Sequence, residues 1–482
     1  MPVPGWLLIL HRYLGVAVGL LMLVWCLSGV VMMFVRYPEL PEARRVRGLE
    51  PIRWSACCMF RASVSGTTPI RSATVEALAG SPVVRMRTAD GNALTLDLAD
   101  GRPIEGVGPA EATEVAQAFA GPRGRPAPPR TVDLDQWTVS GEFRPDRPLY
   151  KVALGDPAGS ELYVSSRTGE AVQLTTASGR FWNWLGAVPH WLYPTLLRQD
   201  AGLWSQVVIW TSLVGCFLTV TGLYLGLAAL RRSAGRWSPY RRVWLWHHLA
   251  GVGFGVLTLA WVASGLVSMN PLGFLESPPD DARARLEGAA PSWGQVQGAL
   301  QRLARSSPPG MVSVSTAPLG GRLYLLARTA KGEELRLDAN GSPAPMDAGK
   351  LADAAHRLAS SRPIASQGVI TAEDAYYFRH HEPVLAPVYR VILQDGTRYY
   401  LDAGTARLVR VADGAAQGYR WLHQGLHRWD VIPGLHDGPV WAILMIAALA
   451  GVTTGVGTGV YLGLKAVLRD VRRLSRGRAR AP

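Results

Sequence analysis

Four long stretches without charged residues dominate this sequence. A helix needs roughly 20 apolar residues to cross the hydrocarbon core of a membrane, which is about 30 Å thick. The stretches run from Tyr13 to Val35, from Ala201 to Leu230, from Val243 to Leu275 and from Gly438 to Leu464. The first is longer than the apolar core of a signal peptide, about 7 to 15 residues, and no A-x-A cleavage pattern follows it. The sequence therefore predicts an α-helical membrane protein with four transmembrane helices.

The positive charges show how these helices should be oriented. The net charge is +14. Basic residues gather after the second stretch (Arg231, Arg232, Arg236, Arg241, Arg242) and after the fourth (Lys465, Arg469, Arg472, Arg473, Arg476, Arg478, Arg480). The positive-inside rule places both clusters in the cytoplasm. Both termini are then cytoplasmic, and in a bacterial inner membrane the two long connections are periplasmic. We expect the basic clusters to contact membrane lipid and not nucleic acid.

This orientation divides the chain into eight predicted segments. They are a first transmembrane helix (1–36), a first periplasmic region (37–180), an interface helix with the second transmembrane helix (181–230), a cytoplasmic loop (231–242), the third transmembrane helix (243–275), a second periplasmic region (276–417), an interface helix with the fourth transmembrane helix (418–464) and a basic cytoplasmic tail (465–482). Strand pairs around Asp90-Gly91 and Asp395-Gly396, with amphipathic segments such as Ser292 to Ser306, predict at most two small α+β domains per region.

The two halves of the chain align with each other. At an offset of 236 residues His11, Gly15, Gly19 and Ser28 match His247, Gly251, Gly255 and Ser264, and at an offset of 237 Trp184, His190, Trp204 and Thr221-Gly222 match Trp421, His427, Trp441 and Thr458-Gly459. Agreement of several separate blocks at nearly one offset indicates an internal duplication. We therefore predict two parallel repeats, each consisting of a helix, an outside domain and a second helix.

Histidines at membrane depth are the candidate functional residues. His11, His247 and His248 lie near the predicted cytoplasmic ends of the helices, and His190, His423, His427 and His436 lie near the periplasmic ends. Ionisable residues in such positions are costly and usually functional. Two neutral imidazoles from facing helices can hold a haem iron. Equivalent residues at equal depth should face each other, so we predict that His11 pairs with His247 and His190 with His427.

Several neighbouring residues have alternative interpretations. His248 and His423 could replace the adjacent histidines as ligands, and the spacing of His423 and His427 also suits a transition metal. The glycines one and two turns after His11 and His247 leave room for a porphyrin or form a small-residue helix contact. His380-His381-Glu382 is interpreted mainly as solvated surface. Adjacent cysteines rarely pair, so Cys57 and Cys58 receive no role, and the tryptophans near the periplasmic boundary are interpreted as an aromatic belt.

The chain resembles the PepSY-associated transmembrane proteins. The resemblance rests on His11-Arg-Tyr-Leu-Gly15 opening the first span, on Tyr400-Leu401-Asp402-Ala-Gly404 ending a strand pair, and on Tyr461-Leu-Gly463. It covers nearly the whole chain and implies that each repeat carries a periplasmic α+β PepSY-like domain. Some members are described as di-haem ferric-siderophore reductases of the inner membrane. The resemblance thus implies two haem b groups and an electron acceptor such as a ferric siderophore.

These observations lead to one main hypothesis and one rival. The main hypothesis is a transmembrane haem protein that passes electrons from quinol or a cytoplasmic reductase to a periplasmic acceptor. The rival is a non-enzymatic, membrane-anchored PepSY module that binds a periplasmic peptide, a protease or a metal-uptake partner. The sequence contains no P-loop, no dinucleotide fingerprint and no Ser-His-Asp pattern, so hydrolase chemistry is unsupported.

Overall fold

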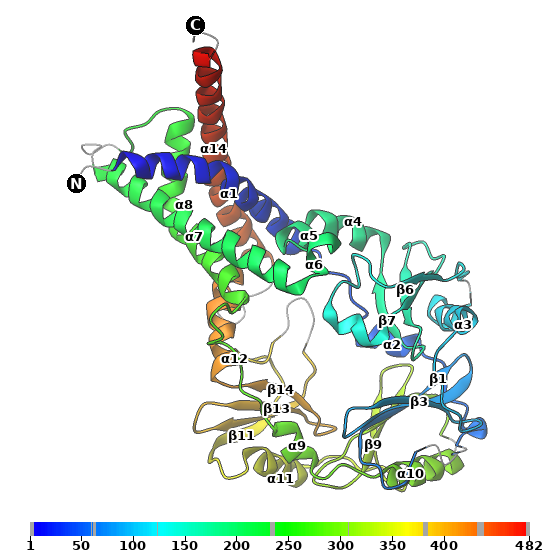
Figure 1. Ribbon diagram of the computed structural model, residues 1–482. Coiled ribbons are helices and arrows are strands. Elements are labelled where there is room, and N and C mark those ends of the chain that lie inside the picture. The colour runs from blue at the N-terminus through cyan, green and yellow to red at the C-terminus, as the bar shows by residue number, and fades with distance from the viewer. Residues whose placement is uncertain are drawn as a thin grey trace. The chain divides into compact units, whose positions relative to one another are not determined.

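The computed structural model describes eight ranges of the chain, namely residues 4–58, 60, 64–122, 124–231, 237–306, 308–378, 384–430 and 438–478. They form two compact units (Figure 1). The membrane unit comprises Met1–Tyr37, Phe181–Glu276 and Ala415–Pro482, and the sheet unit comprises Pro38–Arg180 and Ser277–Gly414. Among the residues of earlier interest, Arg232, Arg236, His380, His381, Glu382, His436 and Arg480 lie outside the described residues.

Four helices of the membrane unit are long and apolar enough to cross a membrane, among the residues that the structure describes. They are α1 (Gly5–Met32), α7 (Ala201–Arg231), α8 (Val243–Ser268) and α14 (Pro439–Arg478). The predicted spans are confirmed, but two helix ends differ. Helix α8 stops before Leu275 because Asn270 has a positive φ and Pro271 follows it. Helix α14 continues past Leu464 because residues 464–476 contain no glycine or proline.

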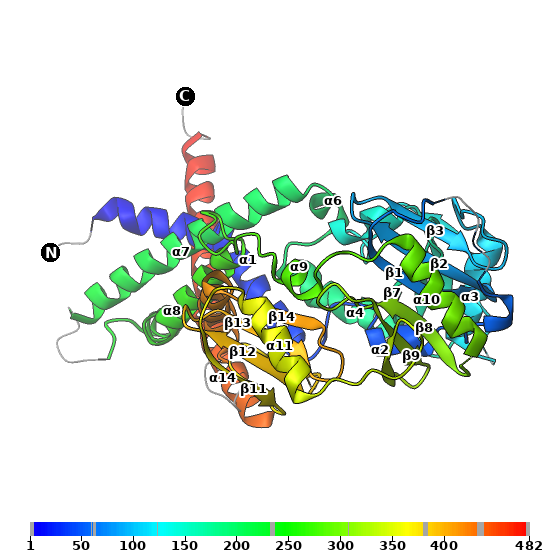
Figure 2. The same ribbon diagram turned by 90° about the horizontal axis from the view of Figure 1, so that it is seen from below.

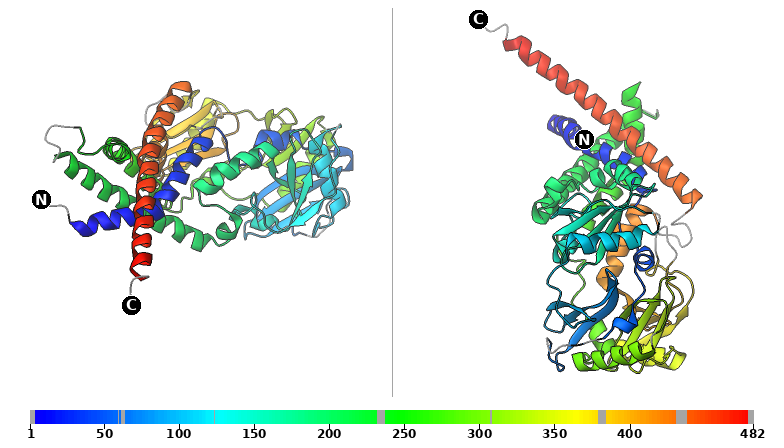
Figure 3. Two further views of the ribbon diagram at one scale, coloured as in Figure 1. Left: turned by 90° about the horizontal axis from the view of Figure 1, so that it is seen from above. Right: turned by 90° about the vertical axis from the view of Figure 1, so that its right-hand side faces the viewer.

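The four helices pack through small residues. Helix α1 packs on α14 and α7, and α8 packs on α7 and α14 (Figure 3). A Cβ atom at Gly19 would lie 3.1 Å from Val460, and one at Gly255 would lie 2.5 Å from Leu223. These close approaches explain why glycine occupies both positions, since the neighbouring side chains fill the space that a methyl group would need.

Short helices connect the long ones within the membrane unit. They are α4 (Ala177–Leu185, which begins in the sheet unit), α5 (Ala187–His190), α6 (Thr195–Arg198), α12 (Gly414–Tyr419), the π-helix η3 (Arg420–Gly425) and α13 (Leu426–Arg428). The buried Arg420 forms a 2.7 Å ion pair with the buried Asp430, which fixes the turn that follows α13. These short helices carry His190, His423 and His427.

The described residues of the sheet unit form three antiparallel sheets. Its strands are β1 (Ile70–Leu78), β2 (Ser81–Thr88), β3 (Ala93–Asp97), β4 (Arg130–Val132), β5 (Leu149–Ala153), β6 (Glu161–Ser165), β7 (Ala171–Thr175), β8 (Met311–Thr316), β9 (Tyr324–Thr329), β10 (Glu334–Asp338), β11 (Ile364–Ile370), β12 (Val388–Leu393), β13 (Arg398–Asp402) and β14 (Leu408–Ala412). The molecule is therefore mixed helix and sheet, with the α-helical membrane unit and the sheet-containing outside domains that the sequence predicts.

The first strands of the two outside regions belong to one sheet. Its order is β10-β9-β8-β1-β2-β3, and β1 pairs with β8 so that Val75 lies opposite Val314. The prediction of separate small domains within each region is wrong for these strands. The physical reason is that β1 and β8 would otherwise be open edges with unpaired backbone groups. Their pairing gives these N–H and C=O groups hydrogen-bond partners. The two remaining sheets, β4-β5-β6-β7 and β11-β12-β13-β14, each come from one region.

Helices cover these sheets and complete their cores. The helices and 3₁₀ turns of the sheet unit are α2 (Glu42–Arg47), η1 (Trp54–Ala56), α3 (Pro109–Ala120), η2 (Gly141–Asp146), α9 (Ala282–Glu287), α10 (Trp293–Ser306) and α11 (Ala348–Ala359). Helix α10 crosses the joint sheet (Figure 2), and its Trp293 and Leu300 share one buried core with Val75 and Val314. Helices α3 and α11 pack on β5 and β6 and on β11 and β12, respectively.

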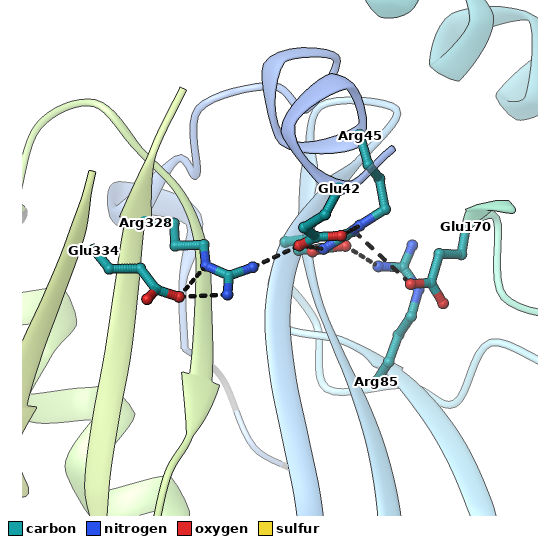
Figure 4. A network of polar contacts seen from close by, with 7 residues as sticks. Glu42, Arg45, Arg85, Glu170, Arg328 and Glu334 are labelled. Atoms are coloured by element: carbon teal, nitrogen blue, oxygen red, sulfur yellow. Dashed lines mark hydrogen bonds and ion pairs between the residues drawn. The ribbon is translucent and has the colours of Figure 1, made fainter. Parts of the chain in front are cut away.

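A charged network joins the pieces of the sheet unit (Figure 4). Glu76 of β1 is buried, and it accepts hydrogen bonds from Arg45 at 2.8 Å and Arg85 at 2.9 Å. Glu42 bonds both Arg45 and Arg328, and Arg328 also pairs with Glu334. The network thus links α2 and β1 with β9 and β10, which come from the other outside region.

The structure corrects one expectation about cysteine. Cys57 and Cys58 are joined by a disulfide bond, although adjacent cysteines rarely pair. Both pack against the buried core of the joint sheet.

Candidate functional site

Two pairs of histidine rings face each other in the membrane unit. The first pair is His11 of α1 and His247 of α8, whose ring centres are 6.4 Å apart with planes inclined at 42°. The second pair is His190 of α5 and His427 of α13, whose ring centres are 6.0 Å apart with planes inclined at 80°. The structure therefore brings together the two pairs that the internal alignment predicts.

The separation of the rings fits a shared metal ion. A metal–imidazole bond is about 2 Å long, and a ring nitrogen lies about 1.1 Å from the ring centre, so two imidazoles on opposite sides of one iron have centres about 6 Å apart. Both observed separations agree with this value.

Hydrogen bonds to the Nδ1 atoms orient the second pair. His190 Nδ1 lies 3.1 Å from the Trp25 carbonyl oxygen and 3.1 Å from Ser28 Oγ, and Ser28 already donates its hydroxyl proton to the Val24 carbonyl. His190 Nδ1 is therefore the donor. His427 Nδ1 lies 3.0 Å from Ser264 Oγ, whose proton goes to the Trp261 carbonyl, so His427 Nδ1 donates as well.

The first pair is held in the same tautomer. His247 Nδ1 lies 3.0 Å from the carbonyl oxygen of Gly455, which can only accept. His11 Nδ1 lies 3.4 Å from Thr221 Oγ1, and Thr221 donates its own proton to the Leu218 carbonyl. In all four histidines the Nδ1–H group is thus the donor, and the Nε2 lone pair has no hydrogen-bond partner in the described part of the chain. A metal-binding histidine typically has this arrangement.

His248 is placed differently from His247. Its Nε2 lies 2.9 Å from the Gly226 carbonyl oxygen, and its Nδ1 lies 2.8 Å from Ser238 Oγ. Ser238 Oγ in turn accepts a hydrogen bond from the Tyr240 backbone N–H. Both ring nitrogens of His248 are therefore used within the protein, and the ring attaches the segment after α7 to α8. Of the two adjacent candidates, His247 is the one with a nitrogen free to bind iron.

His423 lies beside the second pair without being part of it. Its Nδ1 donates to the Ser264 carbonyl at 2.9 Å, and its ring centre is 5.4 Å from that of His427. Gly186 occupies the equivalent position in the first half of the chain. His423 therefore gives the second pair an additional imidazole on one side only, in the π-helix η3. Such π-helical turns are frequent at functional sites.

The glycines near the first pair have two distinct roles. A Cβ atom at Gly15 or Gly251 would meet nothing within 4 Å, so open space lies beside both ligand helices there. Gly19 and Gly255 instead form helix contacts, as described above. The small-residue helix contact is therefore confirmed for Gly19 and Gly255, and room for a porphyrin beside Gly15 and Gly251 stays a prediction.

Two further glycines make room for the histidine rings themselves. A Cβ atom at Gly222 of α7 would lie 2.8 Å from His11 Cε1, and one at Gly459 of α14 would lie 2.8 Å from His247 Cε1. Each ring of the first pair therefore rests on a helix surface where a side chain larger than hydrogen would collide with it.

Burial keeps the second pair uncharged. Desolvation lowers the pKa of His190 to about 4, with a small opposing effect from its hydrogen bond to Trp25. Desolvation also lowers the pKa of His427 to about 3, and the neighbouring His190, His423 and Arg428 lower it further. Both imidazoles are neutral at neutral pH, which is the form that binds a metal ion.

Other candidate features carry less weight. Among the described residues, no group of three or more His, Cys, Asp or Glu side chains is arranged to hold a metal ion. A site formed by protein ligands alone, the alternative for His423 and His427, is therefore unsupported there.

Several residues of the site were not assigned from the sequence. Ser28, Ser264, Thr221, Gly222 and Gly459 all contact or accommodate a paired histidine. Each of them lies in a block that the internal alignment matches, so the sequence did mark these positions as equivalent between the two halves. Their role was missed because a repeat shows which positions correspond but not which side chains touch.

Comparison with known proteins places this arrangement in a family. The model of the family described as PepSY-associated TM region matches residues 8–462. No curated protein matches the chain.

Proposed function

Because the chain belongs to the family of PepSY-associated TM regions, we propose that it is a transmembrane electron carrier that binds two haem b groups through the two histidine pairs. The observation that carries this proposal is the shared state of the four rings. Each uses Nδ1–H as a hydrogen-bond donor within the protein and leaves the Nε2 lone pair free, with the two ring centres of each pair about 6 Å apart. Each bound haem would supply a one-electron couple of its iron.

Neighbouring residues hold the histidines of each pair in position. Ser28, Ser264 and the Gly455 carbonyl hold the imidazoles in the tautomer that binds a metal ion. Two histidines that both ligate one haem iron would leave it no position for oxygen, so each pair would support electron transfer.

The two pairs lie at different heights along the helices. His11 and Ser28, the contact of His190, are both on α1 and are separated by 17 residues, or about 25 Å. This spacing suits a carrier that moves electrons across most of a bacterial inner membrane. We infer that the chain consists of two parallel repeats, that both termini are cytoplasmic and that the sheet unit is periplasmic.

The proposed acceptor is a periplasmic ferric siderophore, and the proposed donor is quinol or a cytoplasmic reductase. Reduction of Fe(III) to Fe(II) consumes one electron and weakens its binding to hard oxygen ligands, which would release the iron. Reporter fusions test the orientation directly. Fusions at Gly121 and Gly341 should report periplasm and a fusion at Tyr240 should report cytoplasm, and the opposite pattern would contradict the proposed direction of electron flow.

Optical spectroscopy of the detergent-purified protein tests the haem proposal. Protein from haem-replete cells should show a haem spectrum whose bands sharpen on addition of dithionite, at two haems per chain. His427→Ala should lose about half of the haem, because one of two sites loses a ligand. His356→Ala is the matched control, since His356 lies on α11 of the sheet unit, and it should retain all of the haem.

The same preparation distinguishes the rival function. A folded, colourless protein would refute the electron-carrier proposal and would support a membrane-anchored module that binds a periplasmic peptide, a protease or a metal-uptake partner. A coloured protein that does not reduce ferric chelates would retain the haem proposal and refute only the proposed acceptor.

A further inference from the structure

Two tryptophans bind the backbone directly after the histidines of the second pair. The Trp204 indole N–H donates to the carbonyl oxygen of Trp191, which follows His190, at 2.9 Å. The Trp441 indole N–H donates to the carbonyl oxygen of Arg428, which follows His427, at 2.7 Å. In both cases the donor lies 13 residues after the acceptor. The same contact therefore occurs twice, at the residue next to each candidate ligand.

These bonds connect the histidine turns to the long helices. Trp204 lies in the first turn of α7 and Trp441 in the first turn of α14. His190 ends the four-residue helix α5, and His427 lies in α13, the last three residues of the helical run 414–428 that also contains α12 and η3. Each histidine therefore lies in the last turn of a helical segment, where backbone carbonyl groups lack partners within the helix. The position of that turn depends on what it is attached to.

Each histidine of the second pair is thus held from two sides. On one side its Nδ1–H bonds to α1 or α8, through Ser28 and the Trp25 carbonyl or through Ser264. On the other side its own turn is bonded to α7 or α14 through an indole. Two attachments on different helices fix the ring more completely than one, because a single hydrogen bond permits rotation about its axis.

The surroundings of the two indoles support this role over that of a membrane belt alone. Trp441 is only 7% exposed and belongs to a buried cluster with Met445 and Leu449. Trp204 is half-buried between Arg198 and Tyr193. A belt tryptophan needs an N–H group that reaches the interface. Both of these N–H groups instead point to a backbone carbonyl of the protein.

We propose that Trp204 and Trp441 are positioning residues that set the ring orientation of His190 and His427. The proposal rests on the haem-binding function proposed above. The near-perpendicular planes of the second pair, at 80°, differ from those of the first pair, at 42°. In a ferric haem with two imidazole ligands, the largest g value of the electron paramagnetic resonance spectrum depends on this angle. The two sites should therefore give two distinguishable signals.

The test uses Trp204→Phe and Trp441→Phe in the full-length protein. Phenylalanine keeps an aromatic ring but removes the N–H donor. Each variant should keep two haems per chain, shift or broaden the signal of the near-perpendicular site, and shift the midpoint potential of that haem while the other signal and potential stay unchanged. Trp210→Phe on α7 is the control, since Trp210 is 62% exposed, and it should leave both signals unchanged.

The outcomes separate the two proposals. If wild-type protein contains no haem with two histidine ligands, the proposed function is refuted before the variants are compared. If wild-type protein shows both signals and the two variants match Trp210→Phe, the tryptophans are refuted as positioning residues and the proposed function stands. Because the contact occurs twice, a variant that fails to accumulate leaves the other one to decide the question.

Discussion

At the scale of single residues, the adjacent histidines of α8 provide a sharp comparison. His247 has a free Nε2, whereas both nitrogens of His248 are hydrogen-bonded within the protein. We predict that His247→Ala removes about half of the bound haem, as measured by pyridine haemochrome per chain. His248→Ala should retain the haem, because it removes only the hydrogen bonds to the Gly226 carbonyl and to Ser238. The reverse result would mean that His248 is the ligand.

The glycines beside the first pair lead to a second prediction at this scale. Gly222→Ala and Gly459→Ala place a Cβ atom 2.8 Å from a histidine ring carbon, which is closer than van der Waals contact allows. Each should displace its ring and lower the haem content by up to half. Gly253→Ala on α8 meets nothing within 4 Å and should have no effect.

Gly251 tests whether the open space beside His247 is occupied by a porphyrin. Gly251→Ala also meets no atom of the chain within 4 Å. A loss of haem in Gly251→Ala, but not in Gly253→Ala, is expected if the space beside His247 receives a porphyrin. Equal haem content in both variants would contradict that placement.

At the scale of secondary-structure elements, the buried Glu76 holds α2, β1 and β2 together. Glu76→Gln removes the charged partner of Arg85 and one of the charged partners of Arg45, and breaking such a pair at a buried carboxylate costs about 3 kcal/mol. We predict a thermal unfolding transition several degrees lower, followed by circular dichroism of the detergent-solubilised protein. Asp100→Asn removes an exposed ion pair with Arg102 and should change the transition little. Equal transitions would mean that the network does not stabilise the fold.

At the scale of the whole molecule, the joint sheet makes the two outside regions depend on each other. Residues 38–180 alone would expose the edge of β1 and lose Trp293, Leu300 and Val314 from the shared core. We predict that this segment aggregates when it is expressed by itself. Co-expression with residues 277–414 should restore a soluble complex, measured by size-exclusion chromatography. A stable, monomeric 38–180 segment would contradict this prediction.

The two histidine pairs also make a prediction for the whole molecule. Replacing both His11 and His247 with alanine should remove little more haem than either replacement alone, because the two ligands act as one unit. Replacing His11 together with His427 should remove nearly all of the haem. If the two double variants lost equal amounts, the histidines would not act as two separate pairs.

The sequence by itself determined the features that depend on local pattern. Charge-free stretches of sufficient length located the four membrane helices, and turn pairs such as Asp395-Gly396, where Gly396 has a positive φ, located the hairpins. The internal alignment predicted which histidines face each other, because equivalent residues on equivalent helices reach equal depth. The helix ends at Ser268 and Arg478 were less well predicted, since they depend on a single backbone angle and on the absence of a helix breaker.

Only the tertiary structure decided the contacts between distant residues. Whether His247 or His248 has a free nitrogen depends on Gly455 and Ser238, which no spacing rule connects to them. The pairing of β1 with β8 joins strands more than 200 residues apart, and both edges look equally open in the sequence. In the sequence, Trp204 and Trp441 resemble the tryptophans of a membrane belt. Only the folded structure shows that each indole N–H binds a backbone carbonyl oxygen. Hydrogen bonds have short range and fixed direction, so these distinctions appear only when the chain is folded.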